Sequence, residues 1–328
     1  KNNMQHAKLS FPNNTWETMG PHNRGGRTLC VATNPQNQNT IFAGSASGGL
    51  WRSYKKGDPY SWERIVTGYP VSGVNSIAIS PTDSNIIIIG TGEVYSYQGS
   101  NIGISVRTNR GSFGIGILKS TDGGNTWTKT LNWQYSEQHG VQIIKFNPLN
   151  ENTVWAGTSV GTYKSIDGGD NWSVTNFNPT NLGQGGLGSN STISRIAFHP
   201  TIPDLIFIRA SAGLYRSDDN LQSWTLIPTS ISKFEFHPNN PNIMYAYSGN
   251  SFYISNDAGS SFNLQSTMPV NPSFISVSSN CYDCVYILSS YDGMWKSLDQ
   301  GVNFTFIDSC IIPSYANWKG GFAVNDID

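Results

Sequence analysis

Five aspartates recur in one short local pattern, and repeated carboxylates of this kind could bind a metal ion or take part in acid–base hydrolysis. Each copy reads Ser-x-Asp-x-Gly-x-x-Trp or a close variant of it, as in Ser120–Trp127 and Ser165–Trp172. The aspartates are Asp122, Asp167, Asp219, Asp257 and Asp299. Calcium takes about six to eight oxygen ligands, whereas each copy offers one carboxylate or two, so the pattern is a poor match to a calcium site.

The other residues of the pattern indicate a tight turn. A short acceptor side chain such as Asp can accept hydrogen bonds from backbone N–H groups of its own segment. The glycine allows the positive φ that a tight hairpin needs, and the final ring can pack over the turn. We therefore predict that the five aspartates stabilise turns, and we expect neither a metal site nor a cofactor.

A second group of candidate residues lies in the long Gly- and Ser-rich segment from Thr91 to Gly114. Long loops within compact domains are usually functional or disordered. The charged and aromatic side chains of this loop could bind a polar ligand, or they could form a salt-bridged cover. These candidates are Glu93, Tyr95, Tyr97, Arg107 and Arg110. Trp133 is a further ligand-binding candidate, because an exposed indole can stack on a sugar; its alternative role is packing between sheets.

Other residues that often carry chemistry have structural interpretations here. His199 and His237 occur in the same Phe-His-Pro context, which indicates a repeated turn position. The sequence contains no HExxH or P-loop motif. Cys281 and Cys284 form a CxxC pair, which can mean zinc, redox chemistry or a disulfide. The pair lies in a predicted hairpin and lacks two further ligands, so we predict a disulfide that fixes a turn.

The elements around the five copies are short strands. Each copy is preceded by an apolar strand, a turn and a second strand, as in 141–148 followed by 153–157. One more strand enters the turn and one leaves it, which gives four strands per unit. The copies recur at intervals of roughly 40 to 50 residues, which is typical of stacked supersecondary units. Four antiparallel strands repeated radially form a blade of a β-propeller.

We therefore predict an all-β, seven-bladed β-propeller in a single domain, 1–328. The six complete blades are expected at about 25–66, 71–130, 140–177, 191–228, 230–266 and 271–308. The last blade would combine 15–20 from the N-terminus with 316–328, and we expect the natural chain to continue beyond Asp328. A ring left open would expose strand edges, which soluble proteins avoid.

The composition excludes several classes of function. Charged residues make up 12% of the chain and the net charge is −1, so the chain lacks the basic patch that nucleic acid or an anionic membrane would require. No apolar run approaches the ~18 residues of a membrane-spanning helix. The abundance of Asn, Ser, Thr and Gly, together with the predicted disulfide, favours a secreted or cell-surface protein.

The repeated pattern and its strands resemble those of the Asp-box (BNR) propellers, over nearly the whole chain. That superfamily includes sialidases, sortilin-type receptors and xyloglucan-cleaving glycoside hydrolases. The stretches 25–27, 43–53, 90–93 and 116–124 look most like the N-terminal propeller of large secreted bacterial surface proteins with a C-terminal sorting domain. The resemblance implies a propeller fold and leaves the function open.

The catalytic residues of the enzymatic relatives do not carry over to this sequence. Xyloglucanases have a catalytic Asp in their first blade, and the matching position here holds Ala46. The resemblance to sialidases implies three arginines, and the early Arg-Ile-Pro motif that supplies one of them is absent. Arg24 or Arg27 could serve only as displaced substitutes.

We therefore expect a non-catalytic secreted or surface propeller that binds a glycan or protein partner at the mouth of its central channel. Export machinery or a surface complex is a possible partner. We expect no nucleic acid and no direct membrane insertion. The alternative is a xyloglucanase- or sialidase-like glycoside hydrolase whose site is divergent or is completed outside this chain. A sortilin-like peptide receptor or a structural spacer is a third possibility. Facing carboxylates ~5–9 Å apart in a cleft would favour the hydrolase.

Overall fold

The computed structural model describes residues 27–71, 73–94, 97–98, 107–108, 112–175, 177, 193–210, 212–220 and 222–309. This part of the chain is built from β-strands, with one short 3-10 turn, η1 (Tyr135–Glu137). The strands form six four-stranded antiparallel sheets and one two-stranded hairpin. The predicted β-propeller of four-stranded blades is therefore confirmed.

The first three sheets are made of consecutive strands, except where the hairpin intervenes. Sheet 1 contains β1 (Thr28–Asn34), β2 (Asn37–Ser45), β3 (Leu50–Ser53) and β4 (Trp62–Ile65). Sheet 2 contains β5 (Val74–Ile79), β6 (Ile87–Thr91), β9 (Gly116–Ser120) and β10 (Thr128–Asn132), and the hairpin β7 (Tyr97–Gln98) and β8 (Arg107–Thr108) lies between β6 and β9. Sheet 3 contains β11 (Val141–Asn147), β12 (Asn150–Thr158), β13 (Gly161–Ser165) and β14 (Ser173–Val174).

The last three sheets repeat the same order. Sheet 4 contains β15 (Ile193–Phe198), β16 (Ile206–Ala210), β17 (Gly213–Ser217) and β18 (Thr225–Leu226). Sheet 5 contains β19 (Lys233–Phe236), β20 (Met244–Ser248), β21 (Ser251–Ser255) and β22 (Asn263–Thr267). Sheet 6 contains β23 (Phe274–Ser278), β24 (Cys281–Ser289), β25 (Gly293–Ser297) and β26 (Thr305–Asp308).

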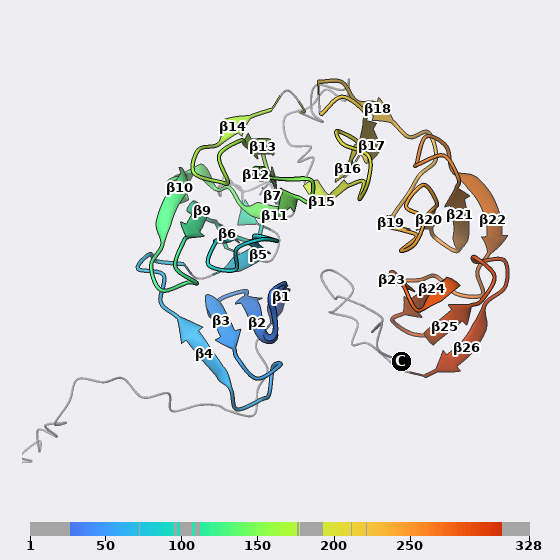
Figure 1. The fold of residues 1–328 in the computed structure, drawn as a ribbon, viewed down its shortest axis with the longest axis horizontal. Helices are drawn as coiled ribbons and strands as arrows, with labels where there is room; N and C mark the ends of the chain where they lie inside the picture. Colours follow the sequence, from blue (N-terminus) through green and yellow to red (C-terminus); the bar gives the residue numbers. More distant parts are fainter. Residues whose placement is uncertain are drawn as a thin grey trace, which may run out of the picture.

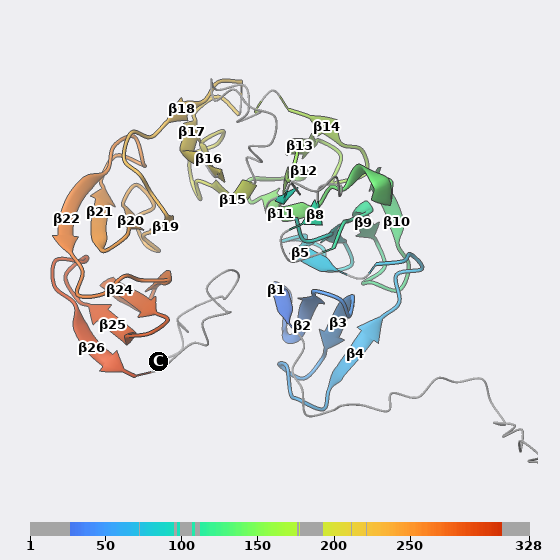
Figure 2. The ribbon, with the colours of Figure 1, turned by 180° about the vertical axis from the view of Figure 1, so that it is seen from behind.

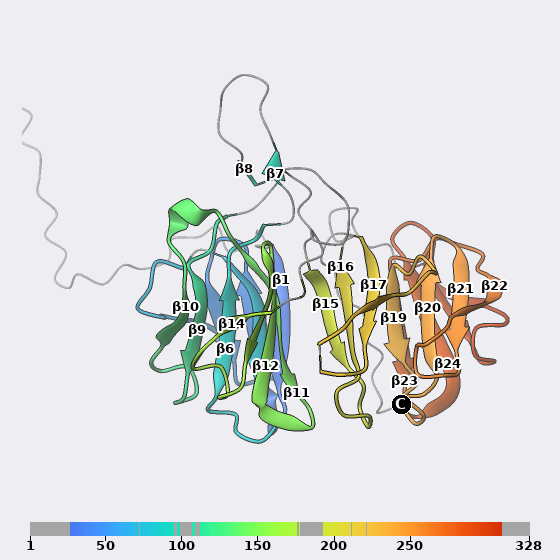
Figure 3. The ribbon, with the colours of Figure 1, turned by 90° about the horizontal axis from the view of Figure 1, so that it is seen from above.

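The six sheets stand side by side along an arc, with the first strand of each sheet toward its centre (Figures 1 and 2). Sheets 1 and 6 lie at the two ends of this arc (Figure 1). Seen from above, the axes of the strands are roughly parallel to one another, and hairpin β7–β8 projects beyond one end of them (Figure 3). The predicted seventh blade, from 15–20 and 316–328, falls outside the described residues.

The second strands of sheets 2 to 5 contain runs of buried residues because neighbouring sheets cover both of their faces. In β6, Ile87 and Ile89 pack with residues of sheet 1, whereas Ile88 packs with residues of sheet 3. All three side chains are 0% exposed. Successive strand residues point to opposite faces, so a continuous run of isoleucines is what a strand between two apolar neighbours requires.

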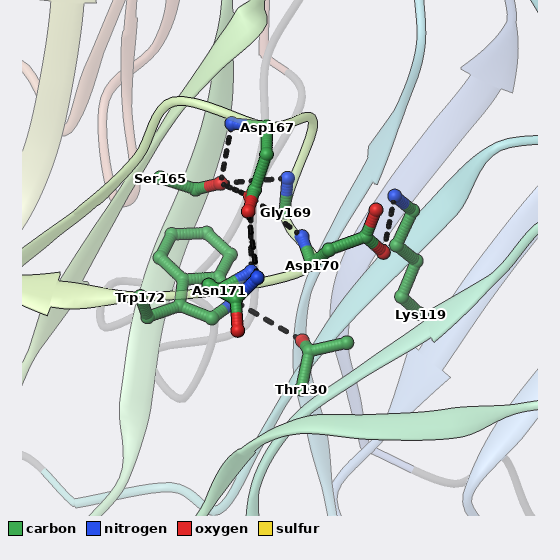
Figure 4. Close-up of polar contacts among 8 residues, drawn as sticks. All are labelled: Lys119, Thr130, Ser165, Asp167, Gly169, Asp170, Asn171 and Trp172. Atoms are coloured by element: carbon green, nitrogen blue, oxygen red, sulfur yellow. Dashed lines mark hydrogen bonds and ion pairs between the residues drawn. The ribbon is translucent and has the colours of Figure 1, made fainter.

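The repeated Ser-x-Asp pattern forms the turn between the third and fourth strands, here called the Ser–Asp turn. In sheet 3 the Ser165 hydroxyl donates to Asp167 Oδ1 over 2.7 Å and accepts from the Gly169 N–H over 2.8 Å (Figure 4). Asp167 also accepts hydrogen bonds from the backbone N–H groups of Asp170 and Asn171, over 3.1 and 2.9 Å. The turn is thus closed from inside by two short side chains.

A backbone hydrogen bond joins this turn to the first hairpin of its own sheet in all six sheets. Its donor is a residue in the left-handed region, for example Gly168 at φ 69°, which donates to Asn152 O over 2.8 Å. The equivalent donors are Lys56, Gly123, Asn220, Ala258 and Gln300. Each sheet is therefore closed by contacts within its own segment of the chain.

Polar contacts also connect neighbouring sheets at the same level. The Lys119 ammonium of sheet 2 lies 2.7 Å from Asp170 in the turn of sheet 3, and Trp172 Nε1 donates to Thr130 Oγ1 of sheet 2 over 3.0 Å (Figure 4). Arg52 of sheet 1 likewise donates to Gly123 O in the turn of sheet 2 over 2.9 Å. These contacts fix the rotation of one sheet relative to the next.

Candidate functional site

The long loop between β6 and β9 leaves its sheet through a closed stem. The Glu93 N–H donates to Ser112 O over 2.7 Å, and Gly114 is tightly packed against Thr91. A Cβ on Gly114 would lie 2.2 Å from Thr91 O, so only glycine allows this approach. The two ends of the loop are therefore held together where they leave sheet 2, and hairpin β7–β8 projects beyond them (Figure 3).

Glu93 lies buried at this stem and is paired with Arg27, which immediately precedes β1. Both guanidinium nitrogens contact the carboxylate, and Arg27 Nη2 lies 2.6 Å from Glu93 Oε2. The Glu93 side chain is 1% exposed, whereas that of Arg27 is 50% exposed. The pair therefore joins sheets 1 and 2 and neutralises a carboxylate that water does not reach.

A buried polar contact joins the same stem to sheet 3. Asn75 Nδ2 donates to Gln142 Oε1 over 2.7 Å and to Val141 O over 3.1 Å. Gln142 Nε2 in turn donates to Val94 O. Buried amide groups need hydrogen-bond partners, so this chain of hydrogen bonds fixes the position of the loop stem relative to the first strands of sheets 2 and 3.

The sequence-predicted loop candidates are only partly brought together. Tyr97 and Arg107 lie on the two strands of hairpin β7–β8, where Tyr97 pairs with Thr108 and Gln98 pairs with Arg107. Tyr95 and Arg110 fall outside the described residues. Glu93 belongs to the stem and is paired with Arg27, a residue that the sequence analysis considered only as a displaced sialidase-type arginine.

Trp133 occupies a packing position. Its side chain is 5% exposed and makes edge contacts with His139 and Tyr163, at ring-centroid distances of 5.1 and 5.9 Å. Burial lowers the pKa of His139 below its ordinary value, which keeps this ring neutral at pH 7. A ring enclosed in this way cannot stack on a sugar without displacing its neighbours.

The five Ser–Asp aspartates are held as carboxylates by their own turns. Hydrogen bonds from Thr126 and Ser223 lower the pKa of Asp122 and Asp219 to about 2. The backbone N–H groups of Asn171 and Asn303 are the largest causes that lower the pKa of Asp167 and Asp299. The pKa of Asp257 is lowered as well. Burial raises this pKa, but the hydrogen bonds from Ser261 and Ser255 together lower it by more. Such groups are poor proton donors near neutral pH.

One residue of the turn was missed by the sequence analysis. The residue four positions after each aspartate donates a side-chain hydrogen bond to Asp Oδ2 over 2.6 to 2.8 Å. These residues are Thr126, Asn171, Ser223, Ser261 and Asn303. The signal was present in the sequence, since all five are short side chains with a donor.

The first sheet forms the same turn without the aspartate. Lys55 stands at the Asp position, and the Ser53 hydroxyl still accepts the N–H groups of Lys55 and Gly57, over 3.2 and 3.1 Å. Trp62 still covers the turn, with its Nε1 donating to Gly57 O over 3.2 Å. The contacts of the serine and the glycine therefore form without an aspartate at that position, and Asp58 accepts the Tyr60 N–H over 3.0 Å further along the turn.

The repeated histidines have the structural role that their context indicated. His199 and His237 are buried, and Nδ1 of each ring accepts two backbone N–H groups of the turn that follows. Cys281 and Cys284 form a disulfide at the start of β24, with their Cα atoms 5.2 Å apart. The predicted cross-link therefore fixes the end of the first hairpin of sheet 6.

Two negative findings apply to the described part of the chain. No group of three or more His, Cys, Asp or Glu side chains there is arranged to hold a metal ion. In the same residues, no helix has the length and the apolar character that a membrane span needs.

Comparison with known proteins shows similarity of fold. No family model and no curated protein matches the sequence. Among solved structures, the GH74 xyloglucanase from Xanthomonas campestris matches with a TM-score of 0.61 and 14% identity, over 86% of this chain and 45% of that chain. YCF48 from Cyanidioschyzon merolae matches with a TM-score of 0.54 and 14% identity, over 87% of each chain.

A third match is the Cps50 (Swd1) β-propeller domain from Myceliophteria thermophila, with a TM-score of 0.55, 10% identity and 87% of each chain covered. This chain spans about half the length of the xyloglucanase that it matches. The three proteins have different names and little sequence in common with this chain. The comparisons therefore establish a β-propeller fold.

Proposed function

We propose that this chain is a non-catalytic binding propeller of the Asp-box class, in a secreted or cell-surface protein. It binds a glycan or protein partner with the face that carries hairpin β7–β8. The observation that carries the proposal is that this face offers no free pair of carboxylates among the described residues. Glu93 is buried and paired with Arg27, and Ala46 stands where the xyloglucanase resemblance places a catalytic Asp.

The position of Ala46 supports this interpretation. The Ala46 N–H donates to Arg27 O over 3.0 Å, so the missing carboxylate position lies beside the Arg27–Glu93 pair. Glycoside hydrolysis needs two carboxyl groups that flank the bond to be cleaved. At this point the described part of the chain offers one carboxylate, and the Arg27 guanidinium group is already paired with it.

The location outside the cell rests on two features. The Cys281–Cys284 disulfide is expected to persist in an oxidising compartment, and the low charge with many Asn, Ser and Thr residues fits a strand-and-turn protein of that environment. Titration of thiols in protein isolated from its native cells, with and without reductant, tests this part. Two additional reactive thiols before reduction would contradict it.

The binding proposal is tested by removing the loop above its stem. Replacement of 95–110 by a short Gly-Ser linker leaves the Glu93–Ser112 hydrogen bond in place, so sheet 2 should remain folded. We expect this variant to lose binding on a glycan array or in a cross-linking assay with the proteins of the native cell surface. Ser53→Ala, which alters a turn of sheet 1, is the matched control and should retain binding. Equal binding by the loop variant would overturn the proposal.

A glycoside hydrolase is the second candidate, because Glu93 is a buried carboxylate at the same face and the matched xyloglucanase is about twice as long as this chain. In that case a second carboxylate would come from outside the described residues. Incubation with xyloglucan or an aryl sialoside, followed by measurement of reducing ends or released aglycone, separates the two candidates. Hydrolysis that is abolished by Glu93→Gln would support the hydrolase.

A further inference from the structure

The first strands of sheets 3, 4 and 5 lie toward the centre of the arc (Figure 1). Each of these strands carries at least one charged residue. Lys145 lies on β11, Arg195 on β15, and Lys233 and Glu235 on β19. The group contains three cations and one carboxylate, so it is net positive. Its members come from three separate sheets, and the fold brings them to one wall.

These charges are not a general feature of the repeat. They stand five or three residues before the proline that follows each first strand. In sheets 1 and 2 the same positions hold the small residues Cys30, Ala32, Ser76 and Ala78. Sheets 1 and 2 stack without charges at these positions, so the charges on sheets 3 to 5 have another role.

Two of the cations are fixed by contacts with the next sheet. Arg195 lies with both terminal nitrogens 2.9 Å from the carboxylate oxygens of Glu235, and it donates to Phe234 O over 2.6 Å. Lys233 donates to Ser273 O over 2.6 Å, and its ammonium lies 3.8 Å from the centre of the Phe274 ring. Glu235 therefore neutralises Arg195, and the excess positive charge resides on Lys145 and Lys233.

Lys145 lines a groove beside this group. The groove has a volume of about 500 Å³, and Lys145 and Arg195 share its wall with Ile143, Phe146, Phe198 and Phe236. Lys145 is exposed to solvent and makes no hydrogen bond or ion pair with the described residues. A cation that lines a groove together with aromatic side chains can meet an anion that enters the groove.

The electrostatic surroundings make an anion favourable here. Desolvation by the surrounding protein, followed by repulsion from Arg195, lowers the pKa of Lys145, and attraction to Glu235 opposes this shift in part. The same two causes, in the same order, lower the pKa of Lys233 to about 8. Each ammonium ion therefore lacks part of the stabilisation that water would give it, and a nearby negative charge would restore that stabilisation.

We propose that this groove binds a small organic anion with one carboxylate and an aromatic or aliphatic body. The carboxylate is held by the Lys145 ammonium at the side of Arg195, and the body lies against Phe146, Phe198 and Phe236. The site belongs to the wall formed by β11, β15 and β19, and it is separate from the face that carries hairpin β7–β8. It is a binding site and needs no catalytic group.

The probe for this site is phenylacetate, and its neutral analogue phenylacetamide is the matched control ligand. Binding is measured at pH 7 by chemical-shift titration of the isotope-labelled chain. We expect saturable binding of phenylacetate, with shifts for Phe146, Ala197 and Phe236, and binding of phenylacetamide that is about tenfold weaker because it lacks the charge-assisted hydrogen bond. Acetate should also bind more weakly, because it lacks the ring.

The variants separate the charge of Lys145 from its shape. Lys145→Gln should weaken phenylacetate binding about tenfold and leave phenylacetamide binding unchanged, whereas Lys145→Arg should restore most of the affinity. Lys164→Gln removes a cation from β13 of the same sheet, outside the groove, and should have no effect. The proposal is overturned if phenylacetate shows no saturable binding or if Lys145→Gln binds it as well as the natural chain does. It is also overturned if acetate and phenylacetamide each bind as tightly as phenylacetate.

Discussion

The buried serine of the Ser–Asp turn should stabilise the protein more than the repeated aspartate does. Ser165 is 1% exposed, and its hydroxyl accepts the buried N–H of Gly169 over 2.8 Å. Ser165→Ala leaves that donor without a partner, which costs about 2 kcal/mol. Asp167 is exposed, and water can replace it as the acceptor for Asp170 and Asn171, so Asp167→Ala should cost about 1 kcal/mol.

The first sheet supplies an internal control for this difference. Its turn has Lys55 in place of the aspartate, while Ser53 accepts the Gly57 N–H over 3.1 Å and is 0% exposed. Ser53→Ala should therefore lower the free energy of unfolding about as much as Ser165→Ala, again by about 2 kcal/mol, although Lys55 stands at the position of the aspartate.

Urea unfolding followed by tryptophan fluorescence measures these costs. With a slope of about 3 kcal/mol per molar urea, 2 kcal/mol corresponds to a midpoint shift of about 0.7 M. The three variants should keep the slope of the natural chain, which shows that the change lies in stability and not in the extent of unfolding. Two results would refute the reasoning: Asp167→Ala as costly as Ser165→Ala, or Ser53→Ala without effect.

Two further predictions concern ionised groups. The pKa of Asp122 and of Asp219 is about 2 in the folded chain, against an ordinary value of 3.8. Between about pH 2 and pH 3.8 the unfolded chain therefore binds more protons than the folded chain does. The urea midpoint should therefore be nearly constant from about pH 8 to 5 and fall as the pH is lowered from about 4 to 2; a midpoint that rises in acid would contradict this. Arg27→Gln should lower the free energy of unfolding by about 2–3 kcal/mol, because it removes the ion-pair partner of the buried Glu93 carboxylate. Glu93→Gln should lower it by about 1 kcal/mol, and the double variant should be more stable than Arg27→Gln alone. Equal costs for the two single variants, measured by the same unfolding assay, would show that the buried charge is not the source of the effect.

The fold could be predicted because its determinants are local and repeated. The Ser–Asp turns give the period, and runs such as Ile87–Ile89 show strands that are covered on both faces. Each sheet is built from one continuous segment, so a reader of the sequence needs no long-range pairing to identify it. The Cys281–Cys284 cross-link is local for the same reason.

The candidate site depends on contacts between sheets, and these have no local signal. Arg27 and Glu93 are 66 residues apart, and nothing near either residue specifies the other. Arg195 and Glu235 meet in the same way, across 40 residues, because two first strands lie side by side. The position of Trp133 was open for a related reason: an aromatic residue after a strand suits both an exposed surface and a contact between neighbouring sheets.

The stem beneath hairpin β7–β8 has a consequence for how this protein can vary. Because the chain enters and leaves through one backbone hydrogen bond, Glu93 N–H to Ser112 O at 2.7 Å, the intervening length can change without altering the registry of β6 and β9. Each doubling of such a segment adds only about 0.6 kcal/mol of closure entropy. Glu93 and Ser112 thus mark an insertion point, where foreign peptides could be grafted for display and where related chains could acquire new specificities while the sheets beneath stay the same.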